Sequence, residues 1–126
     1  MGATGSMLES GEFSVQNWET VDYIEGIKVL EAKKGNNNRG LPALSHTKST
    51  QYILMDKNGK FKQLRKYGMD NKPLFDIDYG RHNNETTFHI HYYRNGIKQP
   101  QDYAVPKSLI EKYKNAFKGV PAKWLK

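Results

Sequence analysis

The sequence predicts an α+β fold: a four-stranded antiparallel meander with a helical amino-terminal part and a packing helix near the carboxy end. Short apolar runs separated by turn sequences fill the middle of the chain, which is typical of strands that pair with their neighbours. Apolar residues at intervals of three near the amino end, and at helical spacing near the carboxy end, indicate helices before and after the sheet. With 126 residues, the chain has the usual size of one domain.

The amino-terminal part begins after a featureless leader. Residues 1–6 are mostly small and Met7 is a second methionine, so we interpret 1–6 as a leader added for expression and 7–126 as one domain. Between 15 and 34, apolar residues at intervals of three permit one helical face: Trp18, Val21, Ile24, Ile27 and Leu30. A short helix to about Glu25 followed by a strand at 27–31 fits the same residues. Residues 33–42 are basic and rich in Asn and Gly, which predicts a loop.

The meander follows from residue 52 onward. Strands are expected at 52–55, 61–67, 74–79 and 86–93, separated by an Asn-Gly turn, a second turn at 68–73 and a polar loop at 80–85. Connections this short join antiparallel neighbours. Residues 94–96 are a further turn sequence. Pro106 stands where a helix can begin, and the helical spacing that follows ends at Gly119 and Pro121.

Side chains of a strand alternate between its two faces, and this period of two divides the third and fourth strands sharply. One face carries only apolar and aromatic residues: Phe75, Ile77, Tyr79, Phe88, Ile90 and Tyr92. The opposite face carries two carboxylates, two imidazoles and a phenol: Asp76, Asp78, His89, His91 and Tyr93. The first set predicts a core, and the second predicts a polar cluster on the other side of the sheet.

Two imidazoles beside carboxylates suit acid–base chemistry near neutral pH, because histidine exchanges protons there. RNA cleavage without a metal or other cofactor needs a base for the ribose 2′-OH, an acid for the leaving oxygen and a cation for the charged phosphorane. We expect His89 and His91 to act as acid and base, and Asp76 or Asp78 to orient an imidazole. His82 and Tyr93 are further catalytic candidates.

Two other interpretations of the polar face stay open. A His-x-His strand with nearby carboxylates can bind zinc, manganese or iron, which would make the protein a metal-dependent hydrolase using His89 and His91. The same side chains can also be a solvated sheet face without chemistry. The composition excludes other classes: the chain has no cysteine for disulfides or thiol chemistry.

The charge of the chain favours an anionic partner. Twenty Lys and Arg against 13 Asp and Glu give a formal net charge of +7, which also serves solubility. We expect phosphate contacts from Arg81 and from Lys62 or Lys66, which alternate with Leu64 on a strand next to the cluster. His46, in a loop rich in hydroxyls, is either a substrate contact or an inert loop residue. No run approaches the ~20 apolar residues of a membrane span, so no membrane partner is expected.

Residues 67–79 (YGMDNKPLFDIDY) and the later Phe88-His89-Ile90-His91 resemble the carboxy-terminal nuclease domains of bacterial polymorphic toxins. The resemblance covers the middle third of the chain. It implies the small α+β ribonuclease fold of barnase-like, EndoU-like and RelE-like enzymes, with 7–126 as the toxic tip. It also implies RNA, including tRNA, as substrate, a cognate immunity protein as partner, and secretion or delivery into the cytoplasm of a target cell. Similar segments end some phage head-morphogenesis proteins, so a non-enzymatic basic module that binds nucleic acid or protein is the alternative.

Overall fold

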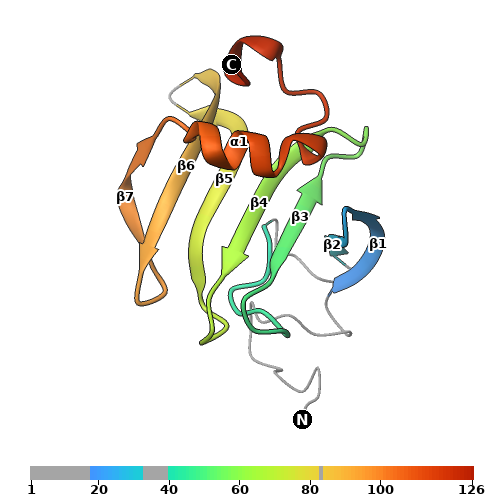
Figure 1. The fold of residues 1–126 in the computed structure, drawn as a ribbon, viewed down its shortest axis with the longest axis vertical. Coiled ribbons are helices and arrows are strands. Elements are labelled where there is room, and N and C mark those ends of the chain that lie inside the picture. Colours follow the sequence, from blue (N-terminus) through green and yellow to red (C-terminus); the bar gives the residue numbers. More distant parts are fainter. Residues whose placement is uncertain (1–17, 33–39, 83) are drawn as a thin grey trace.

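The computed structural model describes residues 18–32, 40–82 and 84–126, with His82 placed only by its backbone. The interpretation of 1–6 as a leader falls outside these residues. The described chain forms a seven-stranded sheet in which the strands lie in sequence order (Figure 1). The strands are β1 (Trp18–Ile24), β2 (Ile27–Ala32), β3 (Gln51–Met55), β4 (Phe61–Tyr67), β5 (Pro73–His82), β6 (Glu85–Arg94) and β7 (Ile97–Tyr103). All neighbours pair antiparallel except β2 and β3, which are parallel.

The predicted helical amino-terminal part is wrong, because the described part of this segment is the β1–β2 hairpin. Glu25 and Gly26, which connect the two strands, both have positive φ angles, of 50° and 81°. Two such residues form the type I′ turn that suits the twist of a two-residue hairpin. The Glu25-Gly26 pair therefore marks the hairpin turn in the sequence, although Glu-Gly is a weaker turn signal than Asn-Gly.

The apparent helical spacing has a local cause in β1. The pairing of β1 with β2 shifts between Thr20 and Asp22, so that Val21 is the extra residue of a β-bulge. Val21 is exposed, whereas Trp18 and Leu30 are buried. The apolar residues at intervals of three therefore lie on different faces of an irregular strand and do not form the face of a helix.

The predicted meander is present but larger than expected, and the predicted four-stranded α+β fold is wrong. Strands β3 to β6 match the four expected ones closely. Asn95 and Gly96, with φ angles of 52° and 78°, turn the chain back into β7 at the sheet edge. An edge strand tolerates Pro100, which has no backbone N–H to donate to a neighbouring strand. The parallel pairing of β2 with β3 joins residues more than 20 positions apart, such as Lys28 and Tyr52, so no local turn sequence predicts it.

A carboxy-terminal helix covers one face of this sheet, as predicted (Figure 1). Helix α1 (Lys107–Lys112) is followed by the 3-10 turns η2 (Lys114–Ala116) and η3 (Ala122–Trp124). Ile110, Tyr113 and Phe117 pack with Leu64, Ile77, Phe88 and Ile90 in the main core. The α-helix is shorter than its spacing predicts, but the 3-10 turn still directs Phe117 at Phe61 and Phe88, each with a ring-centre distance of 5.0 Å. No helix in the described part of the chain is long and apolar enough to span a membrane.

The opposite face of the sheet has a second, smaller core. Trp18, Leu30, Leu41, Tyr52 and Tyr67 are buried together there. The Tyr67 hydroxyl donates a hydrogen bond to the carbonyl oxygen of Pro42 over 2.5 Å, which fastens the segment after residue 40 to β4. This segment and the hairpin therefore cover part of the face on which the polar cluster was predicted.

The β1–β2 turn provides a test of the corrected fold. A Cβ added at Gly26 or at Gly80 meets no atom within 4 Å, but only Gly26 has a positive φ. We expect Gly26→Ala to lower the free energy of unfolding by about 1 kcal/mol, because an L residue is strained in the left-handed region. Gly80→Ala, the matched control in β5, should leave stability unchanged or slightly higher. Urea denaturation of both variants measures this, and equal stabilities would contradict the assigned turn.

Candidate active site

Cross-strand pairing brings the predicted carboxylates and imidazoles together on the face opposite α1. Asp76 pairs with His91 and Asp78 with His89 in the antiparallel β5–β6 register. Gln63 and Arg65 of β4 pair with Asp78 and Asp76, so they share this face. The alternation of the strands thus places the residues as predicted, but the two carboxylates have different neighbours.

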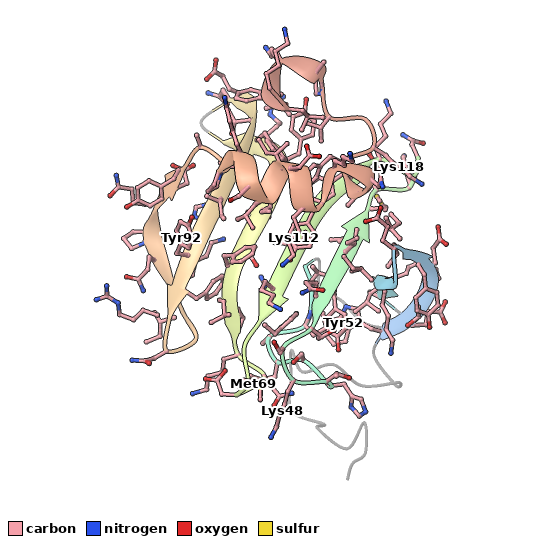
Figure 2. The ribbon with its side chains drawn as sticks, viewed as in Figure 1. Lys48, Tyr52, Met69, Tyr92, Lys112 and Lys118 are labelled. Carbon is pink, nitrogen blue, oxygen red and sulfur yellow. The ribbon has the colours of Figure 1, made fainter. Side chains whose placement is uncertain are left out.

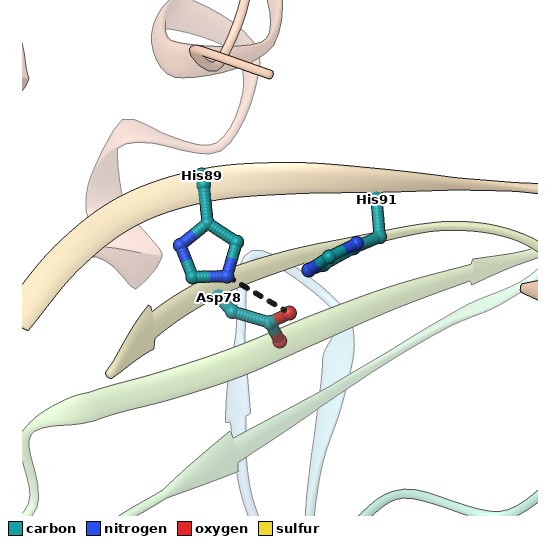
Figure 3. A group of neighbouring side chains, drawn as sticks. All are labelled: Asp78, His89 and His91. Atoms are coloured by element: carbon teal, nitrogen blue, oxygen red, sulfur yellow. Dashed lines mark ion pairs between the residues drawn. The ribbon is translucent and has the colours of Figure 1, made fainter. Parts of the chain in front are cut away.

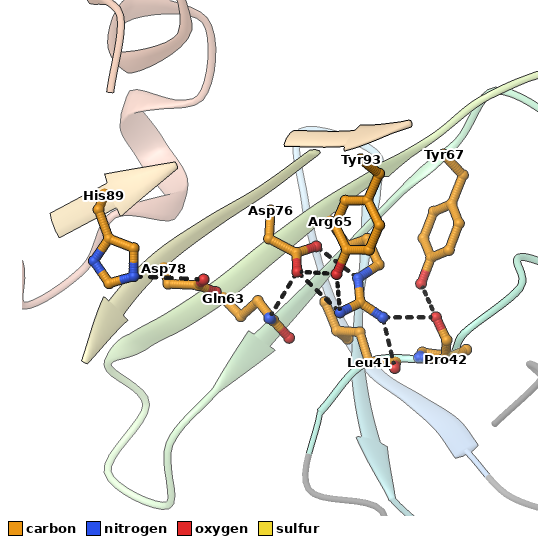
Figure 4. Close-up of polar contacts among 9 residues, drawn as sticks. All are labelled: Leu41, Pro42, Gln63, Arg65, Tyr67, Asp76, Asp78, His89 and Tyr93. Carbon is orange, nitrogen blue, oxygen red and sulfur yellow. Dashed lines mark hydrogen bonds and ion pairs between the residues drawn. The ribbon is translucent and has the colours of Figure 1, made fainter. Parts of the chain in front are cut away.

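Asp76 is the acidic half of a buried ion pair (Figure 4). Its side chain is 0% exposed, and its two oxygens lie 2.6 Å from Arg65 Nε and 3.0 Å from Arg65 Nη2. The Tyr93 hydroxyl donates to the same carboxylate over 2.6 Å, and burial, followed by the negative charge of Asp76, raises the Tyr93 pKa. Asp76 and Tyr93 are therefore engaged with Arg65 and with each other.

The same arginine holds the loop that covers the face. Arg65 Nη1 donates to the carbonyl oxygens of Leu41 and Pro42, both over 3.0 Å. Figure 4 shows the guanidinium between these carbonyls and the Asp76 carboxylate. The network therefore joins β4, β5, β6 and the segment after residue 40 into one unit.

Asp78, His89 and His91 form the chemically open part of the face (Figure 3). One ligand atom from each lies within 4.8 Å of the others. His89 Nε2 is 3.8 Å from an Asp78 oxygen, and the two imidazole rings meet edge to face with centres 5.0 Å apart. The Thr87 hydroxyl lies 2.9 Å from His89 Nδ1 and fixes the orientation of that ring. We call these three residues the Asp78–His89–His91 cluster.

The surroundings shift the pKa values of two groups in this cluster in opposite directions. Burial, followed by the charge of Asp76, raises the pKa of Asp78 to about 6. Burial, followed by the positive charges of Lys98 and His89, lowers the pKa of His91. Groups with pKa values shifted in this way by burial and specific charges are typical of acid–base sites.

The cluster opens into a pocket with a volume of about 390 Å³. Three cationic side chains line the pocket together with the cluster: Lys62, Arg81 and Lys98. A larger hollow of about 680 Å³ beside β1, β2 and β3 contains no histidine, so the smaller pocket is the better candidate for chemistry.

Only some of the other predicted site residues lie at the pocket. Arg81 and Lys62 line the pocket, whereas Lys66 does not and instead donates to the carbonyl oxygen of Ser49 over 3.1 Å. Lys66 shares the core face with Leu64, because the register gives the site face of β4 to Gln63 and Arg65. His46 is exposed and does not line the pocket, and the side chain of His82 lies outside the described residues.

Several side chains of this face were not predicted from the sequence. Lys98 was missed because β7 was not predicted, although the Asn95-Gly96 turn indicated a return strand. Thr87 was missed because only the apolar and ionisable residues of its strand were considered, yet it stands two residues before His89 on the same face. Arg65 was not among the predicted site residues, although the β4–β5 register places it directly opposite Asp76.

The three cluster residues also match a common set of metal ligands. Two imidazoles and one carboxylate suit divalent first-row metals such as zinc, iron or manganese. His91 Nδ1 is buried and has no hydrogen-bond partner within the described residues, so a ligand could use it. Comparison of the chain with models of protein families, with curated proteins and with solved structures gave no match.

The buried ion pair should dominate the stability of this face. We expect Asp76→Asn to lower the free energy of unfolding by about 3–5 kcal/mol, because it leaves the Arg65 charge buried without its counterion. Asp70→Asn, in an exposed turn, should change stability by no more than about 0.5 kcal/mol. Urea denaturation at pH 7 compares them, and similar losses would contradict the special role of Asp76.

In contrast to Asp76, the ionised Asp78 carboxylate should destabilise the folded state. Its pKa is higher in the folded chain than in the unfolded chain, so the folded state binds the proton more tightly and stability falls as pH rises from about 4 to 6. The full effect is about 3 kcal/mol at most, from roughly two pKa units. Asp78→Asn removes it, so the variant should be more stable than the wild type at pH 7. Denaturation of both proteins from pH 4 to 7 measures this, and a difference independent of pH would contradict it.

Proposed function

We propose that the protein is a ribonuclease that cleaves the RNA backbone by acid–base catalysis at the Asp78–His89–His91 cluster. One observation carries the proposal: two imidazoles and a carboxylate lie within 4.8 Å of one another in a pocket that also holds Lys62, Arg81 and Lys98. Acid–base groups supply the proton transfers, and the cations match the charge of a phosphodiester.

The surroundings of the two histidines suggest separate roles. The lowered pKa of His91 keeps its imidazole neutral at pH 7, as a base that removes the proton of the ribose 2′-OH must be. The 2′ oxygen then attacks the phosphorus atom, and the bond to the 5′ oxygen breaks. His89 supplies the proton to the leaving 5′ oxygen, and Asp78, with an oxygen 3.8 Å from His89 Nε2, helps to orient the ring. Lys98, Lys62 and Arg81 offset the charge of the phosphorane.

Other features agree with an RNA substrate. The formal net charge of +7 favours an anionic partner and draws it to the protein over long distances. The setting of a toxin, with delivery into a target cell and a cognate immunity protein, rests on the sequence resemblance alone.

A second candidate function is metal-dependent hydrolysis at the same cluster. The observation that favours it is the geometry of the cluster, in which one ligand atom each from Asp78, His89 and His91 lies within 4.8 Å of the others. A bound metal would activate water, and the cluster residues would then act as ligands.

Cleavage of total RNA and of purified tRNA, with and without EDTA, tests both functions. We expect cleavage that resists EDTA and leaves 2′,3′-cyclic phosphate ends, because the 2′-OH is the nucleophile. His89→Ala and His91→Ala should each lower the rate by at least ~100-fold, the usual contribution of a positioned acid or base. Lys123→Ala, at an exposed cation that does not line the pocket, is the control and should retain full activity.

The outcomes separate the alternatives. Loss of cleavage in EDTA with recovery on adding zinc or manganese would replace acid–base catalysis with the metal-dependent function. No cleavage under any condition, with binding that weakens as salt rises, would identify a non-enzymatic nucleic-acid-binding module. Full activity of both histidine variants would contradict the proposed site.

Thr87 provides a separate test of how His89 is positioned. Thr87→Val keeps the shape of the side chain but removes the hydroxyl that lies 2.9 Å from His89 Nδ1. We expect a several-fold fall in kcat with KM unchanged and a shifted pH profile, and Thr87→Ser should restore both. A change in KM alone would indicate that Thr87 contacts the substrate instead.

A further inference from the structure

The sheet has an uneven distribution of charge between its two faces. In β4 to β7, the four acidic residues are Asp76, Asp78, Glu85 and Asp102. Alternation and pairing place all four on the face that bears His89 and His91. Within these strands, the face that carries α1 therefore has cationic and aromatic side chains but no acid.

Beyond α1, the open part of this face carries a row of aromatic rings. Phe75 and Tyr92 lie opposite each other on β5 and β6 with ring centres 6.4 Å apart, and Tyr92 lies 5.9 Å from Tyr103 of β7. Tyr92 is 38% exposed and Tyr103 is 49% exposed. Figure 2 shows Tyr92 on the side of the sheet that α1 crosses. Tyr92 and Tyr103 belong to neither of the two hydrophobic cores.

Cations flank the aromatic row. Lys66 pairs with Phe75 across β4 and β5, and Arg94 follows Tyr92 by two residues on the same face of β6. Lys112 of α1 faces the same part of the sheet (Figure 2), and its positive charge contributes to a lowered pKa at Lys66 after the larger effect of burial. Two lysines that repel each other beside exposed aromatic rings offer a place for a phosphate.

We infer that this face binds single-stranded RNA, with bases stacked on Tyr92 and Tyr103 and phosphates held by Lys66 and Lys112. Stacking on exposed rings and backbone contact with lysines are the two elements of single-strand recognition on sheets. A protein partner is less well matched, since the strands of this face offer cations but no acid for the lysines and arginines of a typical interface, and Glu111 of α1 is already paired with Lys114. The inference goes beyond the proposed function, because binding here needs no chemistry in the pocket.

The position of β7 connects this surface to the pocket. β7 is the edge strand of the sheet, with Tyr103 on one face and the pocket residue Lys98 on the other. A single strand that passes around this edge reaches both. The surface would then hold the part of a long RNA that lies outside the pocket.

The test uses a fluorescent 12-nucleotide oligouridine with 2′-O-methyl groups, which cannot be cleaved through its 2′ oxygen. Fluorescence anisotropy gives its Kd for the full chain. We expect the double variant Tyr92→Ala/Tyr103→Ala to bind about 10-fold or more weakly, from the loss of stacking. Tyr92→Phe/Tyr103→Phe keeps the rings and should bind like the wild type. Tyr23→Ala, at an exposed tyrosine on β1 at the other edge of the sheet, is the control and should not change Kd.

A salt titration tests the lysines. Lys66→Ala and Lys112→Ala should each reduce the slope of log K against log salt by about 0.7, the value for one single-strand phosphate contact. An unchanged Kd in the double alanine variant overturns the inference, as does an equal loss in Tyr23→Ala. Self-association that the double alanine variant abolishes, without RNA binding, would assign the face to a second copy and also overturn it. Because the probe is not cleaved, the result is independent of the ribonuclease proposal.

Discussion

The ion pair between Arg65 and Asp76 is the interaction on which the rest of the site face depends. It joins β4 to β5, takes a hydrogen bond from Tyr93 on β6, and holds the carbonyls of Leu41 and Pro42 over the sheet. A charge buried this completely is stable only with its counterion and with hydrogen bonds to the remaining donors. The network supplies both, so the covering segment and three strands are held in a single arrangement.

This arrangement gives two carboxylates on one strand opposite properties. Asp76 is tied to Arg65, while Asp78, two residues later, faces His89 and the pocket. The fixed charge of Asp76 adds to burial in raising the pKa of Asp78. A structural ion pair thereby influences the proton affinity of the neighbouring cluster, which links the stability of the face to the chemistry that we propose for it.

The two faces of the sheet divide binding from chemistry in our proposals. The site face holds the acids and imidazoles, and the face under α1 holds aromatic rings and cations. Both faces extend to β7, an edge strand that was not predicted from the sequence. Its Lys98 and Tyr103 belong to opposite faces, so this strand is where a substrate in contact with both would cross the sheet.

The sequence by itself determined which residues of β5 and β6 share a face, because the period of two puts Asp76 and Asp78 on one side of the sheet with His89 and His91. The register that pairs Asp76 with His91 and Asp78 with His89 is visible only in the structure. The sequence also predicted β3 to β6 and the carboxy-terminal helix for similar local reasons. Only the tertiary structure decided the parallel pairing of β2 with β3, the extra β7, and the partner of each carboxylate. These depend on contacts between residues far apart in sequence, such as Arg65 with Leu41, and local periodicity carries no information about them.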